Sequence, residues 1–280
     1  GGEEKEFEIK IPLIEDLTWR EPPVFKDDSF TKLPTAKLSY MIEQMQFTIS
    51  QESPRNYGTV GYFHKVNDNT LRLVGTDGYR LSHCEIKASL PENFLGKGIC
   101  LSKRALTELH RMCTEGFETI EIAVDEDQNT LLAHLEGYKV FIRISAVKYP
   151  NYQGVLPKGN LNSVEISRSH LQGVTKRVLL ASDKSRALRL SFAKNALTLS
   201  SKTMGSSEGK ELVNIEKYTG EPRKLAVNGR FLTDIFSATT SNDIEMQFKP
   251  DSNDALVILP KSEPDGCHSM HVLVPIKESQ

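Results

Sequence analysis

Hydrophobic and polar residues alternate along most of the chain in short runs, which is the pattern of half-buried antiparallel strands. Polar turn residues separate neighbouring runs, as at Asn67-Asp68-Asn69 and at Lys194-Asn195. The pattern therefore predicts a chain rich in antiparallel sheet. The predicted strands are Tyr57–Val66, Thr70–Gly75, Thr119–Val124, Thr130–Leu135, Lys139–Ile144, Arg186–Phe192, Ala196–Ser200, Ile244–Phe248, Leu256–Leu259 and Met270–Pro275.

A second pattern interrupts the strands four times, at intervals of roughly 65 residues. Each copy has an apolar residue, a residue suited to start a helix, three mostly polar or small residues and a second apolar residue. The side chains of Ser102, Ser167 and Asn228 can accept hydrogen bonds from free N–H groups at a helix start, and Pro34 has no N–H to leave unpaired. Each copy predicts a strand that ends and a helix that begins. The copies are Leu33–Leu38, Leu101–Leu106, Ile166–Leu171 and Val227–Leu232.

Each predicted helix has one apolar stripe, such as Leu38, Met41 and Met45 in the first, which indicates a face turned toward a core. The fold class is therefore α+β, built from repeated units of one helix and an antiparallel sheet. The opposite helix faces are basic. Such a face is either merely solvated or meets phosphate groups. Its residues are Lys37, Lys103, Arg104, Arg111, Arg168, Lys176, Arg177 and Arg230.

Composition and charge narrow the possible functions. The 280 residues are 38% hydrophobic and 26% charged, as in an ordinary globular chain. A net charge of −2 argues against a protein that coats nucleic acid with its whole surface, but it leaves room for one basic face. The four cysteines form no CxxC pair and no metal-type spacing, which favours free structural thiols in a reduced, cytoplasmic chain. We expect no metal and no cofactor.

The start of the chain has a different sequence pattern from the rest. Residues Gly1–Glu6 have no apolar core of a signal peptide, and Glu6–Ile11 has the pattern of a strand that closes a domain. We therefore expect residues 1–25 to be the tail of a truncated first domain followed by a linker, Ile14–Pro23. A second domain is predicted over 26–157 and a third over 158–280, with a linker at Leu156–Asn160 between them.

The segment Thr76–Leu81 contains both a turn signal and a carboxylate that an enzyme could use. Asp77-Gly78 between two strand-like runs predicts a hairpin, because glycine accepts a positive φ. The alternative is an enzyme, a hydrolase or isomerase that uses Asp77 with His110 or His134. No phosphate-binding loop and no metalloprotease or serine-hydrolase motif accompanies it. The turn is the favoured interpretation.

Four ordered segments resemble motifs of the bacterial DNA polymerase III beta-subunit family, the replicative sliding clamps. They are Thr76–Leu81, Tyr149–Pro157, Leu180–Leu190 and Val272–Lys277. The resemblance covers the second and third predicted domains and only the tail of the first. It implies a non-enzymatic processivity factor that encircles double-stranded DNA, with helices lining the inner face and sheets outside. It also implies a homodimeric ring when the first domain is present.

The resemblance also implies three sets of site residues. A pocket for partner peptides would comprise Thr76, Gly78, Tyr79, Arg80, Leu81, Pro150, Val155, Val272, Val274 and Ile276. DNA contact would involve Arg55, Tyr57, Lys103, Arg104, Arg111, Arg168, Lys176 and Arg177. The dimer interface would include Leu179, Leu180, Lys184 and Arg186. The chain departs from the family at Gly154, where many clamps have a basic residue, and at Gly58 or Thr59, where an aliphatic pocket residue is expected.

The implied partners are DNA, the DNA polymerase III alpha subunit, a clamp loader, and other polymerases and repair proteins that carry clamp-binding peptides. Within the pocket, Arg80 and the backbone at Gly78 would orient the polar atoms of a peptide, while the aliphatic residues take its apolar anchors. A second hypothesis is a peptide-binding adaptor of the same fold that does not encircle DNA.

Overall fold

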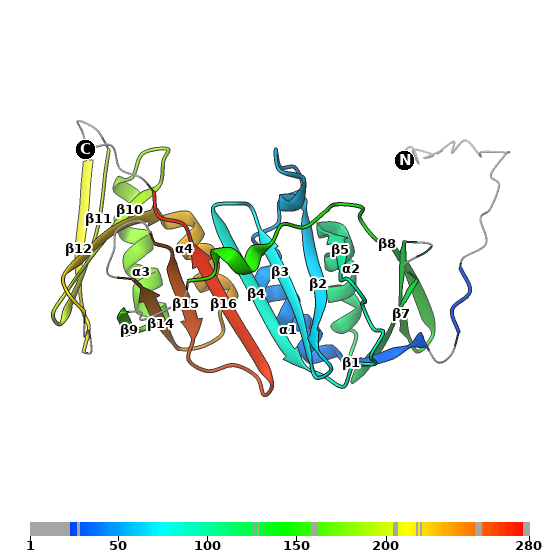
Figure 1. Ribbon diagram of the computed structural model, residues 1–280. Helices are drawn as coiled ribbons and strands as arrows, with labels where there is room; N and C mark the ends of the chain where they lie inside the picture. Colours follow the sequence, from blue (N-terminus) through cyan, green and yellow to red (C-terminus); the bar gives the residue numbers. More distant parts are fainter. Residues whose placement is uncertain are drawn as a thin grey trace, which may run out of the picture.

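The computed structural model describes residues 23–26, 29–125, 127, 129–157, 162–203, 207–216, 218, 220–249 and 254–276. Its helices and sheets form two similar halves that lie side by side (Figure 1). Each half contains a pair of helices, and every helix begins at one copy of the repeated pattern. The helices are α1 (Thr35–Gln46), α2 (Lys103–Cys113), α3 (Arg168–Val178) and α4 (Gly229–Ala238).

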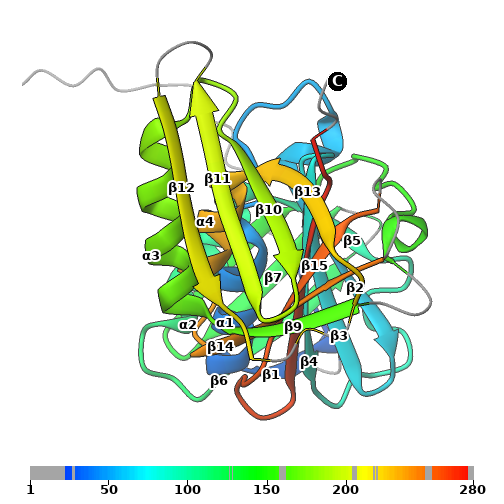
Figure 2. The same cartoon turned by 90° about the vertical axis from the view of Figure 1, so that its left-hand side faces the viewer.

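Three antiparallel sheets accompany the helices. The first has the order β1 (Thr31–Pro34), β6 (Thr119–Asp125), β7 (Thr130–Leu135) and β8 (Tyr138–Arg143). The second, which stands beside α3 in Figure 2, has the order β12 (Ser207–Asn214), β11 (Ala196–Thr203), β10 (Ala187–Ala193) and β13 (Arg223–Asn228). The third spans both halves in the order β5 (Ile99–Ser102), β2 (Val60–Asn67), β3 (Thr70–Thr76), β4 (Arg80–Lys87), β16 (Cys267–Leu273), β15 (Leu256–Pro260), β14 (Asp243–Phe248) and β9 (Asn162–Ser167).

Each half has its own hydrophobic core, formed by the apolar stripes of its two helices and the inner faces of its sheets. Leu38, Met45 and Leu109 belong to the first core, and Leu171 and Phe236 to the second. The repeated helix-plus-sheet architecture predicted from the sequence is confirmed. The domain limits 26–157 and 158–280 stay a prediction, and the expected strand Glu6–Ile11 and linker Ile14–Pro23 lie outside the described residues, apart from Pro23.

Two of the predicted helix caps are confirmed and one is wrong. The Ser102 side chain accepts a hydrogen bond from the Ala105 N–H, and the Asn228 side chain accepts from the Arg230 N–H. Ser167 precedes α3 but makes no capping hydrogen bond, since its Oγ lies 3.4 Å from Ser169 Oγ instead. A capping residue type at the right place is therefore not sufficient for the cap.

Most predicted strands are confirmed within a few residues, with corrections at strand ends. Tyr57 lies in a 3₁₀ turn, η2 (Asn56–Thr59), and not in a strand. Arg186 has a φ of 54°, so it precedes β10 and does not begin it. Strand β12 escaped prediction because it is a polar edge strand, in which Val213 alone is buried. Two more 3₁₀ turns are η3 (Tyr152–Val155) and η4 (Leu179–Ala181).

The four cysteines, Cys84, Cys100, Cys113 and Cys267, are free and buried, as expected for structural thiols. Burial raises the pKa of Cys100 to about 11 and that of Cys113 to about 12, which keeps both in the unreactive thiol form. Within the described part of the chain, no helix is both long and apolar enough to cross a membrane.

The two halves are joined by strand pairing and by helix α1. Strand β16 pairs with β4 along its whole length, and the two lie together at the centre of Figure 1. On the helix side, Gln44 Nε2 donates to the Ala238 carbonyl over 2.7 Å. The Tyr40 hydroxyl donates to Glu263 Oε1 over 3.0 Å. The joint is therefore held on both of its sides.

Two buried histidines in this joint predict that acid lowers the stability of the fold. His83 of β4 and His271 of β16 are buried, and burial lowers the pKa of each to about 3. Between that value and about 6.5, where an unfolded histidine titrates, the unfolded chain binds more protons than the folded one. The free energy of unfolding should therefore fall as the pH falls, by about 1.4 kcal/mol per pH unit for each histidine.

Urea unfolding at pH 7.0 and pH 5.5 measures this effect. His83→Gln should remove part of the pH dependence, whereas His268→Gln should not, because His268 is exposed. An unchanged pH dependence in His83→Gln would show that this histidine does not contribute to the loss.

Candidate functional site

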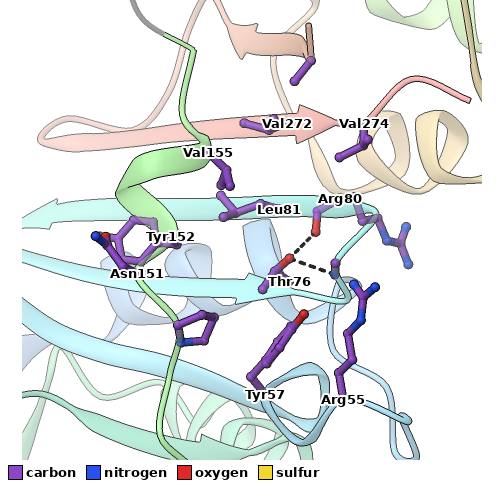
Figure 3. A pocket seen from close by; sticks show the side chains of 13 residues that line it. Arg55, Tyr57, Thr76, Arg80, Leu81, Asn151, Tyr152, Val155, Val272 and Val274 are labelled. Atoms are coloured by element: carbon purple, nitrogen blue, oxygen red, sulfur yellow. Dashed lines mark hydrogen bonds between the residues drawn. The ribbon is translucent and has the colours of Figure 1, made fainter. Parts of the chain in front are cut away.

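A pocket of about 220 Å³ opens where the two halves meet. Its walls come from the turn between β3 and β4, from the segment around η3 and from the end of β16 (Figure 3). All of the predicted peptide-pocket residues except Tyr79 and Ile276 line it. The complete lining is Arg55, Tyr57, Thr76, Gly78, Arg80, Leu81, Pro150, Asn151, Tyr152, Val155, Ala255, Val272 and Val274.

The predicted hairpin at Asp77-Gly78 forms one wall, and side-chain hydrogen bonds fix its shape. Asp77 Oδ1 accepts from the Tyr79 and Arg80 N–H groups over 2.9 and 3.0 Å. Thr76 Oγ1 donates to the Arg80 carbonyl over 2.7 Å and accepts from the Gly78 N–H over 3.1 Å, as Figure 3 shows. Gly78 has a φ of 88°, which favours glycine. The shape of the turn is therefore set by bonds within the turn itself.

The floor of the pocket is buried and its rim is exposed. Leu81 and Val272 face each other across the β4–β16 ladder and are 4% and 3% exposed. Val155 and Val274, above them in the pocket, are 59% and 51% exposed. Apolar side chains that remain this exposed beside a buried apolar floor are typical of a binding site for an apolar partner group.

The two pocket arginines differ in what they contact. Arg80 is 9% exposed, and its Nη1 donates to Asp234 Oδ2 over 2.7 Å. Its Nε donates to Asp77 Oδ2 over 3.0 Å and its Nη2 to the Phe47 carbonyl over 2.7 Å. The guanidinium that was expected to orient a peptide is therefore already bonded within the protein.

Arg55, in contrast, has an exposed side chain with no ion pair to any of the described residues, and its guanidinium carbon lies 5.4 Å from the centre of the Tyr79 ring. Gly78 leaves the space that this guanidinium occupies, because a Cβ there would lie 1.6 Å from Arg55 Nη1. Sequence reasoning assigned Arg55 and Tyr57 to DNA contact, but the structure places both on the pocket wall. DNA contact by these two residues stays a prediction.

Tyr79 and Ile276 lie beside the pocket. Tyr79 is 61% exposed at the tip of the turn, and its carbonyl accepts from the Val274 N–H over 2.9 Å. Ile276 donates its N–H to the Ala226 carbonyl over 2.7 Å. These two hydrogen bonds attach the end of the described chain to both halves, so both residues shape the pocket indirectly.

A cluster of aromatic rings supports the wall that contains Pro150 and Val155. Tyr152 is buried, and its hydroxyl accepts from Arg72 Nη1 over 2.7 Å and lies 2.9 Å from His64 Nε2. Tyr149 stacks on Tyr62 with ring centres 5.0 Å apart. Sequence reasoning missed Asn151 and Tyr152 as lining residues although they lie within the recognised motif. It also missed Ala255, for which the sequence offers no signal.

The two family departures have different structural consequences. A Cβ at Gly58 would lie 2.6 Å from Ser53 Oγ, so the space of a side chain is already filled at this position. At Gly154 a Cβ would meet nothing within 4 Å, so a side chain would fit there without displacing a neighbour. Neither glycine lines the pocket in this structure.

Four of the six helix residues predicted to contact DNA already contact other groups of the protein. Lys103 Nζ donates to the Ile49 carbonyl, and Arg168 donates to the Ser241 and Phe236 carbonyls. Arg111 pairs with Glu108 and Glu115, and Arg177 pairs with Glu211. Arg104 and Lys176 are exposed and make no ion pair with a described residue. The basic faces thus hold fewer free charges than the sequence indicates.

The residues predicted for a dimer interface lie at the exit of α3. Leu180 is 86% exposed, whereas Leu179 is partly buried and packs against the second core. Lys184 and Arg186 follow in the loop before β10. Nearby, Leu212 of the edge strand β12 is 61% exposed. The placement provides an apolar surface at a sheet edge, and its role stays a prediction.

The alternative of an enzyme based on Asp77 is contradicted by its surroundings. Asp77 is bonded within the turn and to Arg80. His110 pairs with Glu43, and His134 with Glu121 on another sheet. The three residues do not form a common site.

Comparisons with known proteins match both halves. The family described as DNA polymerase III beta subunit, central domain, matches residues 32–151. The family described as DNA polymerase III beta subunit, C-terminal domain, matches residues 153–275.

Similar whole proteins are sliding clamps. The beta sliding clamp of Caulobacter vibrioides is 26% identical over 263 residues, which cover 91% of this chain and 68% of that protein. The beta sliding clamp of Pseudomonas aeruginosa is 26% identical over 86% of this chain and 64% of its own length. The chain thus spans about two thirds of the length of these relatives.

Solved structures agree on the fold. A crystal structure of the Pseudomonas aeruginosa DNA polymerase sliding clamp with ligand superimposes with a TM-score of 0.82 at 24% identity, covering 93% of this chain and 69% of that one. A sliding clamp from Bartonella birtlesii bound to griselimycin has a TM-score of 0.81 at 26% identity, covering 93% of this chain and 70% of that one.

The family matches and the fold confirm the sequence-based prediction of a non-catalytic sliding clamp of the α+β clamp fold. They cover the central and C-terminal parts of the beta subunit. The chain belongs to the DNA polymerase III beta-subunit family, the bacterial DNA sliding clamps.

Proposed function

We propose that the chain captures short peptides of replication proteins in the pocket at the joint, and that it does so as part of a ring around duplex DNA. The observation that carries the proposal is the pocket itself. Eight residues predicted from three distant segments meet around one cavity with a buried apolar floor and an exposed apolar rim. This arrangement suits the two apolar anchors of a peptide of the form Gln-x-x-Leu-Phe.

The partners follow from this role. We expect the DNA polymerase III alpha subunit, other polymerases and repair proteins to compete for the same pocket, each through its own peptide. Such tethering raises the effective concentration of a polymerase at its template without any new catalytic group. A clamp loader would be needed to open the ring, and the site of action is the bacterial cytoplasm. The ring itself would be a homodimer closed through the surface around Leu180.

The DNA-facing surface is proposed to lie on the helices. Of the helix residues predicted to contact DNA, Arg104 of α2 and Lys176 of α3 are the exposed ones with no ion pair to a described residue, so they are well placed to meet phosphates. Contacts to the sugar-phosphate backbone bind without reading sequence, as sliding requires.

Replacing both residues by alanine should weaken binding to a short DNA duplex and reduce its salt dependence. The slope of log affinity against log salt should fall by about 0.9 for each phosphate that the variant no longer neutralises. The fold and peptide binding should stay intact. Fluorescence anisotropy at salt concentrations between about 20 and 150 mM measures this slope.

A matched control removes two exposed lysines from the sheets, Lys139 of β8 and Lys224 of β13. Its salt slope should equal that of the parent. An equal decrease in both double variants would contradict a DNA surface on the helices.

The second hypothesis, an adaptor that binds peptides but does not encircle DNA, is favoured by one observation. Arg111 and Arg177 pair with carboxylates, and Lys103 and Arg168 donate to carbonyls within the protein, so these four side chains are less available to phosphates. Peptide binding without salt-dependent DNA binding would support this hypothesis over the ring.

A further inference from the structure

Arg80 lies between the pocket and the helices of both halves. It lines the pocket from β4, and its guanidinium carbon lies 4.2 Å from the centre of the Phe231 ring and 5.3 Å from that of Phe47. Its strongest contact to the other half is the ion pair with Asp234 of α4, with Nη1 and Oδ2 2.7 Å apart. A single side chain of the pocket turn is therefore held by a helix of the other half.

Asp234 is partly exposed to solvent in a cavity that is separate from the peptide pocket. It is 34% exposed and lines a separate cavity of about 570 Å³, together with Phe47, Lys103 and residues of α1 and α4. It does not line the peptide pocket. Its bond to the pocket is the ion pair with Arg80, which does line the pocket.

We propose that Asp234, acting through Arg80, is a positioning residue for the peptide pocket. The inference rests on the proposed function of that pocket. The ion pair ties the turn at Asp77-Gly78 to α4, and it thereby holds Thr76 and Leu81 of one half opposite Val272 and Val274 of the other.

The physical reason is the burial of Arg80. Without Asp234, a guanidinium that is 9% exposed keeps one carboxylate, Asp77, which belongs to its own turn. A charge that loses a partner in a buried place moves toward another acceptor or toward water. Because Arg80 directly precedes Leu81 in β4, such a movement shifts the floor of the pocket.

Asp234→Asn tests the inference, since it removes the charge and keeps the size of the side chain. The probe is a synthetic peptide ending in Gln-Ala-Ser-Leu-Phe, titrated at a temperature at which all variants are fully folded. Its dissociation constant should rise about tenfold, which corresponds to about 1.4 kcal/mol of binding free energy. The NMR amide signals of Gly78 and Leu81 should shift in the free protein.

Glu211→Gln is the matched control, because Glu211 of β12 is 33% exposed and pairs with Arg177 of α3, and neither residue lines the pocket. It should leave both the dissociation constant and the two amide signals unchanged. Arg80→Met tests whether the pair acts as one unit. Adding Asp234→Asn to Arg80→Met should weaken binding no further, since Asp234 then has no guanidinium to hold.

The outcomes separate this inference from the function on which it rests. If the parent protein does not bind the peptide, the proposed function fails. If the parent binds and Asp234→Asn binds within twofold of it, the function stands and the positioning role is wrong. Additive losses in the double variant would also overturn it, because Asp234 would then act independently of Arg80.

Discussion

Leu81→Asp should weaken peptide binding at least a hundredfold. Leu81 is 4% exposed on the pocket floor and packs with Val74, Tyr152 and Val272. An aspartate there removes an apolar contact worth about 1.5–3 kcal/mol and places an unpaired charge against the apolar anchors of the ligand. We expect at least a hundredfold rise in the dissociation constant of the Gln-x-x-Leu-Phe peptide, measured by calorimetry.

Val274→Asp separates impaired binding from impaired folding. Val274 is 51% exposed on the rim, so its replacement should leave the thermal midpoint nearly unchanged and still weaken peptide binding strongly. Leu212→Asp is the control, because Leu212 is 61% exposed on β12 and lies away from the pocket. Full peptide affinity in Val274→Asp would remove the pocket from consideration.

Arg168→Ala should destabilise the fold, although the residue was predicted from the sequence to contact DNA. Its Nε donates to the Ser241 carbonyl over 2.7 Å and its Nη1 to the Phe236 carbonyl over 3.0 Å. Phe236 lies in the last turn of α4, where carbonyls lack helical partners and a positive charge is favourable. Hydrogen bonds from a charged donor contribute about 1.5–3 kcal/mol each, so we expect a loss of about 3 kcal/mol in unfolding free energy.

Arg104→Ala provides the comparison, because Arg104 is exposed and makes no ion pair with a described residue. Urea unfolding should show a large loss of stability for Arg168→Ala and almost none for Arg104→Ala. Equal stabilities would mean that the two carbonyl contacts of Arg168 are replaced by water at no cost.

The contrast between these arginines shows where sequence reasoning ends. A helix face rich in Lys and Arg is visible in the sequence because charge and helical spacing are local properties. Whether a given guanidinium is free depends on acceptors far away in the chain, such as Ser241 for Arg168 or Glu211 for Arg177. No local pattern contains that information.

The fold was predicted more fully than the site. Alternation and the repeated helix start identified all four helices and most strands, because burial on one face imposes a period on the sequence. Strand β12 has almost no buried face, so its sequence shows no alternation of apolar and polar residues. In the sheet it pairs with β11, through backbone hydrogen bonds that leave no pattern in the sequence.

The pocket could be predicted only where motifs were recognised. Leu81 and Val272 came from separate motifs, and the β4–β16 pairing brings them together. Arg55 and Ala255 were not assigned to the pocket, since only the folded joint places them there. Asp234 was overlooked because its partner, Arg80, lies far from it in the sequence.

The central claim is that partner peptides bind at the joint between the two halves. Methyl NMR of the chain during titration with the Gln-x-x-Leu-Phe peptide tests it most directly. Binding at the joint predicts that the methyl signals of Leu81, Val155, Val272 and Val274 shift together and saturate at one dissociation constant, while those of Leu180 and Leu212 stay fixed. Shifts confined to Leu180 and Leu212, or none at the pocket methyl groups under saturating peptide, would contradict it.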